Sequence, residues 1–424
     1  MVIGGKVYMN VSRSFISRTG HWWAGALLAS AVALPVEAHE ATITALFKPD
    51  SAHPHLNKFT NTTPSSGYCE SHASQCEGDD LFSLQVPIQF HSRAPILADH
   101  ASQRQGAMLK APANWRDLTV IHESTGDPQR IRIRIAGIGT RAVTDDVKEL
   151  VGGAEDYRIA HNRLWGSSWV YAPPPCDYTG SGFYNTNYYE FFWKTPMVGA
   201  CAKQAKYNVP WLRFDYLDFA YELETPDPLK MSAGHYTGSL TYTIGPNGDF
   251  DFGDVLLPSD SALTLNFNLD VQHTLKVDIP PGGEKVNLVP AGGWQSWLQA
   301  GRKPARLFRD QTFNISASSR FRMFLQCSIS DGRVCFMADR NLILTAPLKV
   351  SVSLPGGLTD ISGRPVQRQE LLTEGGAVTF QPGHYVDRKP GTLHFELEKP
   401  DHFFLPGAPK HYFGSVTVIW DSEI

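Results

Sequence analysis

The sequence lacks the short motifs that mark many enzyme active sites. It has no Gly-x-Ser-x-Gly nucleophile elbow, no His-Glu-x-x-His zinc motif and no Gly-x-x-x-x-Gly-Lys phosphate loop. His39-Glu40 and His122-Glu123 each lack the second histidine of a zinc motif. Aspartates and glutamates are scattered, so a carboxylate pair for glycoside hydrolysis stays an open alternative that no spacing favours. We therefore expect a binding protein and not an enzyme.

Long apolar runs are also missing after residue 38. The run from Trp22 to Leu34 has 13 residues, whereas a spanning helix needs about 20. It follows Lys6, Arg13 and Arg18 and precedes Val36-Glu37-Ala38, the order that is typical of a cleaved export signal. We expect residues 1–38 to be a signal peptide and the remainder to be soluble and exported. A retained membrane anchor is the alternative, which the short run disfavours.

The chain carries little excess charge. It holds 38 Lys and Arg residues against 42 Asp and Glu residues. The predicted signal contains three of the basic residues and one acidic residue, so the remainder has 35 basic and 41 acidic residues and a net charge of −6. That balance gives no reason to expect nucleic acid as a partner. The 386 residues that follow the signal are too many for one typical domain, so two are expected.

The six cysteines are an even number, as is usual in an oxidising compartment. They fall in neighbouring pairs, although six cysteines allow 15 pairings. A zinc site is the alternative, but there is no Cys-x-x-Cys spacing. The short separations favour three disulfides: Cys69 with Cys76, Cys176 with Cys201, and Cys327 with Cys335.

Alternation of apolar and polar residues predicts strands throughout the chain. It is clear in Ala41–Phe47, Arg130–Ile135 and Leu265–Val271, and 36 glycines and 29 prolines separate most such runs. Only two short helices are expected, over 144–151 and 294–300. The polar, turn-rich stretch 245–261 is the expected seam between the domains. We therefore predict an all-β protein with two tandem β-sandwich domains, 39–255 and 262–424.

One strand pattern occurs twice. Tyr236-Thr-Gly-Ser-Leu-Thr is repeated as Tyr412-Phe-Gly-Ser-Val-Thr, close to the last residue of the sequence. At the two-residue period of a strand, one face of the second copy carries Tyr412, Gly414, Val416, Val418 and Trp420.

The closing strand, the leader and the paired cysteines together resemble the tip adhesins of chaperone–usher fimbriae. Asn57-Lys-Phe-Thr-Asn-Thr-Thr-Pro-Ser-Ser-Gly-Tyr-Cys69 and Phe191-Phe-Trp-Lys-Thr-Pro196 are similar to segments of such adhesins. The resemblance implies a receptor-binding domain followed by an incomplete immunoglobulin-like pilin domain. It also implies a periplasmic chaperone, an outer-membrane usher and an adjacent pilin subunit as partners. The expected location is the extracellular pilus tip.

The resemblance implies that the pilin domain lacks its last strand, so that an apolar groove lies open between its two sheets. The resemblance implies that a chaperone, and later a strand donated by the next subunit, pairs along Tyr412, Gly414, Val416, Val418 and Trp420. A complete sandwich whose last strand happens to be C-terminal is one alternative. Another is a structural pilin or adaptor, in which Ala41–Phe47 would be the donor strand instead of the first strand of the receptor-binding domain. A secreted β-sandwich enzyme that acts on carbohydrates is the third.

Aromatic residues are concentrated in one segment. Residues 165–193 contain eleven, where about three would be expected from the chain-wide 11%. Aromatic rings stack on sugar rings and asparagines can bind hydroxyls, so we expect a host or surface glycan as receptor. Core packing is the alternative, and it is favoured for Phe191–Trp193. The candidate receptor residues are Tyr178, Tyr184, Asn185, Asn187, Tyr188 and Tyr189.

Two further sets of side chains are candidates for binding. Arg130, Arg132 and Arg134 share one strand face and could meet sialylated or sulfated glycans, although solvated arginines or a protected edge would give the same pattern. His53 and His55 have the spacing of two zinc ligands, but no third ligand can be identified. We expect no cofactor, with zinc as the alternative.

Overall fold

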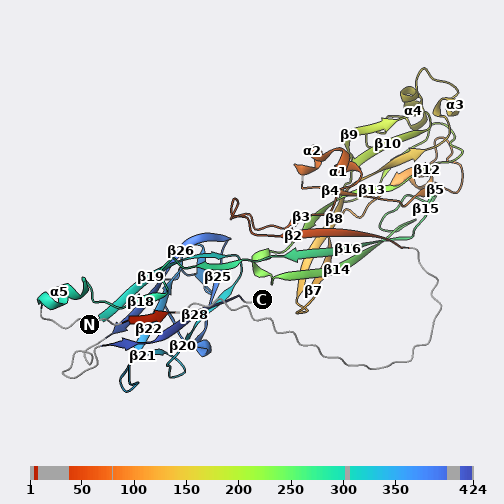
Figure 1. Ribbon diagram of the computed structural model, residues 1–424. Helices are drawn as coiled ribbons and strands as arrows, with labels where there is room; N and C mark the ends of the chain where they lie inside the picture. Colours follow the sequence, from red (N-terminus) through yellow and green to blue (C-terminus); the bar gives the residue numbers. More distant parts are fainter. Residues whose placement is uncertain (1–3, 8–37, 79, 301–305, 399–410, 423–424) are drawn as a thin grey trace, which may run out of the picture.

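The computed structural model describes residues 4–7, 38–78, 80–300, 306–398 and 411–422. Strands make up most of these ranges (Figure 1), so the all-β prediction is confirmed. No helix in them is long and apolar enough to cross a membrane. Residues 8–37, which hold most of the predicted signal peptide, lie outside the described residues.

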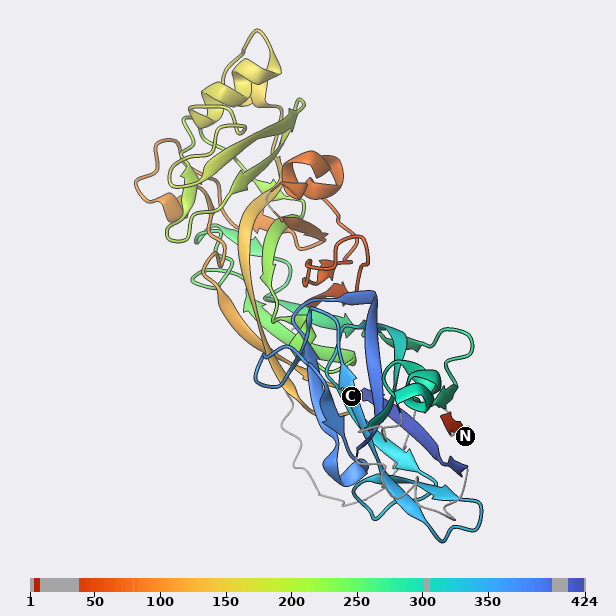
Figure 2. The same ribbon diagram turned by 90° about the vertical axis from the view of Figure 1, so that its left-hand side faces the viewer.

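The buried apolar side chains form two large clusters. One contains residues between Ile43 and Val271, and the other contains residues between Val286 and Trp420. Figures 1 and 2 both show two lobes that lie end to end. We call residues 38–271 the first lobe, and residues 275–422 together with residues 4–7, which pair in one of its sheets, the second lobe.

The first lobe is built around one long strand, β8 (Pro128–Val143). Its first half pairs with β7, and its second half lies between β10 on one side and β12 and β13 on the other. Ile131, Ile133 and Ile135 are buried, as their alternation predicts. The other strands of this lobe are β2 (Ala38–Phe47), β3 (Thr60–Asn61), β4 (Phe82–Val86), β5 (Phe90–Ser92), β6 (Ala107–Leu109), β7 (Arg116–His122), β9 (Asp177–Tyr184), β10 (Tyr188–Lys194), β11 (Cys201–Lys203), β12 (Arg213–Phe214), β13 (Leu217–Glu224), β14 (Gly234–Thr243), β15 (Leu256–Pro258) and β16 (Ala262–Val271).

The helices of the first lobe are short. The predicted helix over 144–151 is shorter than expected, since α3 (Val147–Leu150) begins after Asp146, whose side chain accepts a hydrogen bond from the Lys148 N–H. A further helix, α4 (Tyr157–Trp165), was not expected; Asp156 caps its start and Gly166, at φ 72°, ends it. The other two are α1 (Tyr68–Ser71) and α2 (Ala73–Glu77).

The expected seam between the domains belongs to the first lobe. Phe250, Phe252 and Leu256 are buried in its core because the turn between them folds back onto the sheet. Strand β16, which was expected to open the second domain, pairs over its full length with β14 and with β2. The division between the two cores therefore falls after Val271, later in the chain than the predicted boundary.

Two facing sheets enclose the core of the second lobe. One has the order β18-β1-β28-β20-β25-β23, and the other has the order β17-β19-β26-β22-β21-β27, with β24 on β22. The predicted helix over 294–300 is present as α5 (Gly293–Ala300). The strands are β1 (Gly4–Val7), β17 (Leu275–Asp278), β18 (Lys285–Asn287), β19 (Arg306–Ala317), β20 (Phe321–Cys327), β21 (Cys335–Asp339), β22 (Thr345–Ser353), β23 (Leu358–Asp360), β24 (Gln369–Leu371), β25 (Val378–Pro382), β26 (Val386–Glu398), β27 (Tyr412–Phe413) and β28 (Ser415–Ser422).

The two copies of the repeated sequence pattern lie at different positions in the fold. The first copy is β14, in the interior of the first sheet, where it is followed by β15 and β16 and so does not close its lobe. The second copy changes sheets at Gly414: β27 pairs with β21, and β28 pairs with β20 in the opposite sheet. A side chain at Gly414 would come within 3.0 Å of the Phe336 carbonyl oxygen, which explains the need for glycine at this crossing.

The three predicted disulfides are all present. They join Cys69 to Cys76, Cys176 to Cys201 and Cys327 to Cys335. The first ties α1 to α2 over β13, where Asp218 is buried. The Oδ2 atom of Asp218 accepts a hydrogen bond of 2.8 Å from the Tyr68 N–H, and its Oδ1 atom has no partner among the described residues.

Burial raises the pKa of Asp218 to about 8, and the hydrogen bond from Tyr68 lowers it only in part. The folded chain therefore keeps this proton between about pH 4 and pH 8, whereas the unfolded chain releases it near its ordinary pKa of about 3.9. The contribution of Asp218 to the free energy of unfolding is therefore largest below the pKa of the unfolded chain. Above that pKa it falls by up to about 1.4 kcal/mol for each pH unit, until the carboxyl group ionises in the folded chain as well.

We expect Asp218→Asn to remove this loss because an amide cannot ionise. The variant should gain stability relative to the parent as pH rises from 4 to 8, which denaturant unfolding at several pH values measures. The exposed Asp80→Asn is the control, since Asp80 is largely in solvent and its substitution should give no such trend. If the free energies of unfolding of Asp218→Asn and the parent differed by the same amount at every pH in this range, the raised pKa of Asp218 would be contradicted.

Candidate functional site

Strand β28 is fully paired on one edge only. Its residues from Val416 to Ser422 pair with β20. On the other edge, within the part of the chain that the structure describes, β28 meets β1 alone, over two residue pairs that involve Lys6 and Val7. Strand β1 lies parallel to β28 and antiparallel to β18, so among the described residues this four-residue segment alone separates the two strands.

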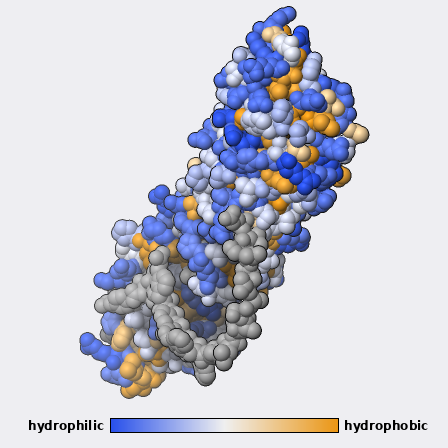
Figure 3. All heavy atoms as spheres, turned by 90° about the vertical axis from the view of Figure 1, so that its right-hand side faces the viewer, coloured by the Kyte–Doolittle hydropathy of each residue, from blue (hydrophilic) through white to orange (hydrophobic). Residues whose placement is uncertain are grey.

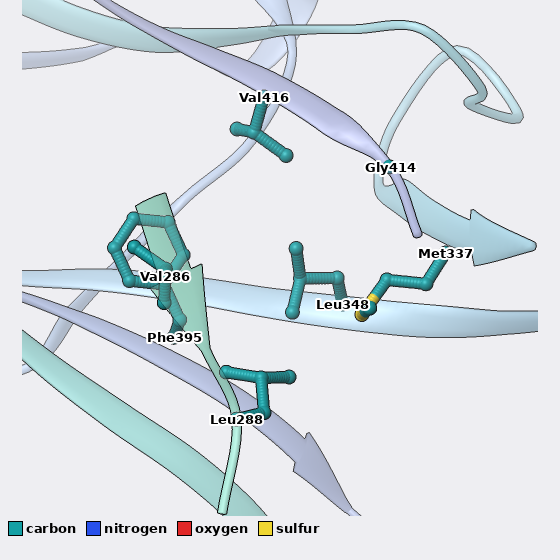
Figure 4. A pocket seen from close by; sticks show the side chains of 7 residues that line it. All are labelled: Val286, Leu288, Met337, Leu348, Phe395, Gly414 and Val416. Atoms are coloured by element: carbon teal, nitrogen blue, oxygen red, sulfur yellow. The ribbon is translucent and has the colours of Figure 1, made fainter. Parts of the chain in front are cut away.

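An apolar pocket lies beside the edge of β28 that faces β18 (Figure 4). Its walls come from both sheets of the second lobe, and no charged side chain lines it. It therefore offers contacts to an apolar side chain that approaches between β18 and β28. The lining residues are Val286, Leu288, Met337, Leu348, Phe395, Gly414 and Val416.

The predicted face of the C-terminal strand points into this lobe. Tyr412, Val416, Val418 and Trp420 are buried, and Trp420 packs edge-on against Phe313 at a ring distance of 5.6 Å. Of the predicted groove residues, only Gly414 and Val416 line the pocket itself. Tyr412 lies in the opposite sheet, on β27, and Val418 and Trp420 lie further along β28. Their pairing with a partner strand stays a prediction.

The sequence analysis missed the opposite wall of the pocket. Val286, Leu288 and Phe395 come from two distant segments, β18 with the residue after it and β26. The alternation of Val286 and Leu288 around Asn287 was a visible signal. That these residues face Val416 depends on the pairing of the sheets, which a local pattern does not reveal.

The predicted receptor residues occupy the hairpin β9–β10 and its turn. This hairpin lies at the end of the first lobe that is far from the second lobe (Figures 1 and 2). Figure 3 shows apolar residues among hydrophilic ones over this end. Strand β9 pairs only with β10, so its other edge is free of strand pairing among the described residues.

The structure separates these residues into four groups. Tyr178 and Tyr184 are exposed, at 61% and 38%, whereas Tyr189 is 2% exposed and belongs to the core, contrary to a role as a free binding surface. Tyr188 is half-buried beneath the Arg141 guanidinium. Asn185 and Asn187 hold the turn: their carbonyl oxygens accept hydrogen bonds from His161 Nε2 and from the Thr144 N–H.

The arginine row on β8 is paired with carboxylates. Arg130 contacts Asp117, and Arg132 and Arg134 contact Glu224 and Glu222 from β13. The guanidinium groups of Arg132 and Arg134 also lie over the Trp115 ring, at 5.2 and 5.5 Å. Each positive charge therefore has a carboxylate beside it, which leaves little attraction for a sialylated or sulfated ligand.

A second row of side chains crosses the sheet near the hairpin. Phe183, Glu190 and Arg141 lie directly opposite one another on β9, β10 and β8. Arg141 donates to Glu190 at 2.7 Å from Nε, and its Nη1 lies 3.9 Å from Asp215. Arg213 donates to Asp215 at 2.6 Å. We call this set, together with Tyr188, the distal network: Phe183, Tyr188, Arg141, Glu190, Asp215 and Arg213.

The histidine pair does not gain a third ligand among the described residues. His53 and His55 lie in a loop, not on a strand; His53 Nδ1 is 2.9 Å from Asp50, and the His55 ring lies 4.4 Å from the His384 ring. The described ranges hold no group of three or more histidine, cysteine, aspartate or glutamate side chains that could bind a metal ion. The geometry therefore adds nothing to the zinc alternative.

No family model and no curated protein matches the chain. Solved structures that are similar to it are fimbrial tip adhesins. A chaperone–tip adhesin complex of CFA/I fimbriae is 10% identical, with 91% of this chain and 97% of that chain covered and a TM-score of 0.24. CfaE, the adhesive subunit of CFA/I fimbria of enterotoxigenic Escherichia coli, is 10% identical over 91% and 98%, with a TM-score of 0.22.

The CsuC–CsuE chaperone–tip adhesin pre-assembly complex of Acinetobacter baumannii is also similar. It is 9% identical over 91% of this chain and 98% of that chain, with a TM-score of 0.20. TM-scores of this size do not establish a shared fold, so the proposals below depend on the geometry of this chain.

Phe395 offers a test of the pocket. It is 1% exposed and lines the pocket, so we expect Phe395→Ala to lower the free energy of unfolding of the second lobe by about 3–5 kcal/mol. Phe413→Ala is the matched control, because that ring is 44% exposed and its loss should cost less than about 0.5 kcal/mol. Denaturant unfolding measures both, and equal effects would show that the pocket wall is not packed as described.

Proposed function

We propose that the chain is a fimbrial tip adhesin, in which the first lobe binds a surface receptor and the second lobe is joined to the pilus by a strand from the next subunit. The observation that carries this proposal is the edge of β28 that faces β18, where the pairing strand comes from the predicted leader. Among the described residues only β1, from the predicted leader, lies between β28 and β18. Export with removal of the leader would take β1 away and leave this edge open.

An open edge of this kind needs a partner. Unpaired N–H and C=O groups on a strand edge template pairing with other chains, and an adjoining apolar pocket adds a second aggregation hazard. A partner strand would satisfy the backbone groups of β28 and place apolar side chains in the pocket. A periplasmic chaperone would cover the edge first, and an outer-membrane usher would then exchange it for the strand of an adjacent pilin.

The N-terminal segment supports a tip position over an adaptor position. An adaptor must donate a strand, so its N-terminal segment should be free. Here β2 pairs with β16 over all ten of its residues and buries Ile43, Ala45 and Phe47 in the first core. Withdrawal of β2 for donation would expose these side chains and break that pairing, so the chain is suited to accept a strand but not to supply one.

We also propose that each lobe is a domain and that the joint is residues 272–274. His273 is hydrogen-bonded to both sides: Nε2 lies 2.9 Å from the Met231 carbonyl oxygen and Nδ1 lies 3.2 Å from Ser318 Oγ. Residues from about 39 to 271 would then form the receptor-binding domain, and those from 275 onward the pilin domain. The receptor domain would act by binding, without catalysis, at the extracellular pilus tip.

The test of this proposal is strand complementation of the chain without its leader. We expect residues 39–424 with a donor peptide of alternating apolar and polar residues fused through a flexible linker to be more stable than the same chain without it. The apolar side chains of the peptide fill the pocket, so the melting temperature should rise by 5 °C or more and binding of a hydrophobic dye should fall.

The control fusion carries aspartate at the apolar positions of the peptide and should give no rise. Val416→Asp in the chain should likewise abolish the effect of the apolar peptide, because a charge would then lie in the pocket. A bare chain that is monomeric, binds no dye and is as stable as the fusion would show that the second lobe is complete and would end the proposal.

A further inference from the structure

The distal network combines exposed aromatic rings with arginine side chains that are paired with carboxylates. Its six residues come from β9, β10, β8 and the segment that begins with β12, and they form a continuous row across the sheet. The Arg141 guanidinium lies 4.8 Å from the centre of the Tyr188 ring, and the Tyr188 ring lies 6.1 Å from the Phe183 ring. Phe183 is 59% exposed, so its ring is available to a ligand at the end of the row.

The charges of this network cancel. It contains two guanidinium groups, Arg141 and Arg213, and two carboxylates, Glu190 and Asp215. Glu190 accepts from both Nε and Nη2 of Arg141, and Asp215 accepts from Arg213. An acidic ligand would have to displace one of these carboxylates or lie next to it, and the repulsion would oppose binding.

Hydroxyl groups suit this arrangement better. A hydroxyl both donates and accepts, so it can bridge a carboxylate oxygen and a guanidinium N–H without removing either from its partner. Arg141 is 40% exposed and Glu190 is 30% exposed, so both can be reached by a ligand. The nearby aromatic rings offer an apolar surface for the C–H face of a sugar ring.

We propose that the distal network is the receptor site and that its ligand is a neutral pyranoside, not a sialylated or sulfated one. This inference rests on the proposed adhesin function. It differs from the prediction that placed acidic glycans on Arg130, Arg132 and Arg134. It also places the site on one face of the hairpin, because Phe183 lies opposite Glu190, whereas Tyr178 lies opposite the buried Trp193 and so points to the other face.

Glycan-array binding of residues 39–424 fused to the apolar donor peptide tests the inference, because the fused strand covers the edge of β28 that removal of the leader would open. The array carries galactose, N-acetylglucosamine and mannose conjugates, each neutral and sulfated, and the galactose conjugate also sialylated. The best neutral conjugate should bind at least tenfold more tightly than its acidic counterparts. Phe183→Ala should weaken that binding at least tenfold because the stacking surface is lost. Tyr178→Ala, on the opposite face of the hairpin, is the matched control, and its affinity for the same conjugate should stay within twofold of the parent value.

Glu190→Gln separates a binding role from a purely structural one. It leaves the guanidinium of Arg141 less compensated, so the ratio of neutral to acidic binding should fall at least fivefold while circular dichroism stays unchanged. A parent chain that prefers the acidic conjugates would overturn the inference, and so would a Tyr178→Ala loss equal to that of Phe183→Ala.

The same experiment distinguishes this inference from the proposed function. A chain that accepts the donor peptide and attaches to host cells, but binds no conjugate, remains an adhesin whose receptor is not a neutral sugar, and the inference fails alone. A chain that rejects the donor peptide and attaches to no surface fails both.

Discussion

The organisation of the second lobe depends on the hydrogen bonding of one strand. Strand β28 pairs with β20 on one side, and on the other side a short segment of the predicted leader is the one strand that meets it among the described residues. Buried or half-buried backbone groups that lack partners are costly, so in the proposed function another strand takes the place of this segment when the leader is removed. The pocket under the edge is lined by apolar side chains, so a strand that replaced this segment would fit best with apolar side chains at alternate positions.

The same constraint explains the difference between the two lobes. The first lobe contains its own N-terminal strand, since β2 pairs parallel to β16 and fills that side of the sheet. In the second lobe the corresponding place between β18 and β28 is held by the four residues of β1, from the predicted leader, because β16 pairs within the first lobe and only three residues connect the two lobes. Under the proposed function, the first lobe is closed by its own strand β2, and a partner strand would close the second lobe once the leader is removed.

Local periodicity predicted strands well and boundaries poorly. The alternation in 41–47, 130–135 and 265–271 was enough to predict buried strand faces, and the close spacing of the cysteines was enough to predict their pairing. The seam was misplaced because the polar turns at 245–261 have the same composition whether they join two domains or fold back onto a sheet. The burial of Phe250 and Phe252 shows that these turns fold back onto the sheet. The distal network was missed because Arg141, Glu190 and Asp215 lie far apart in sequence, and only sheet register aligns them.

The length of β8 has a mechanical consequence. This single strand of 16 residues extends over about 50 Å, from the hairpin with β7 to the row that contains Arg141. A load applied at the far end of the molecule is transmitted along its backbone, parallel to the strands that flank it. Tension along β8 would then shear the ladder bonds on both sides of this strand together instead of peeling them open one after another.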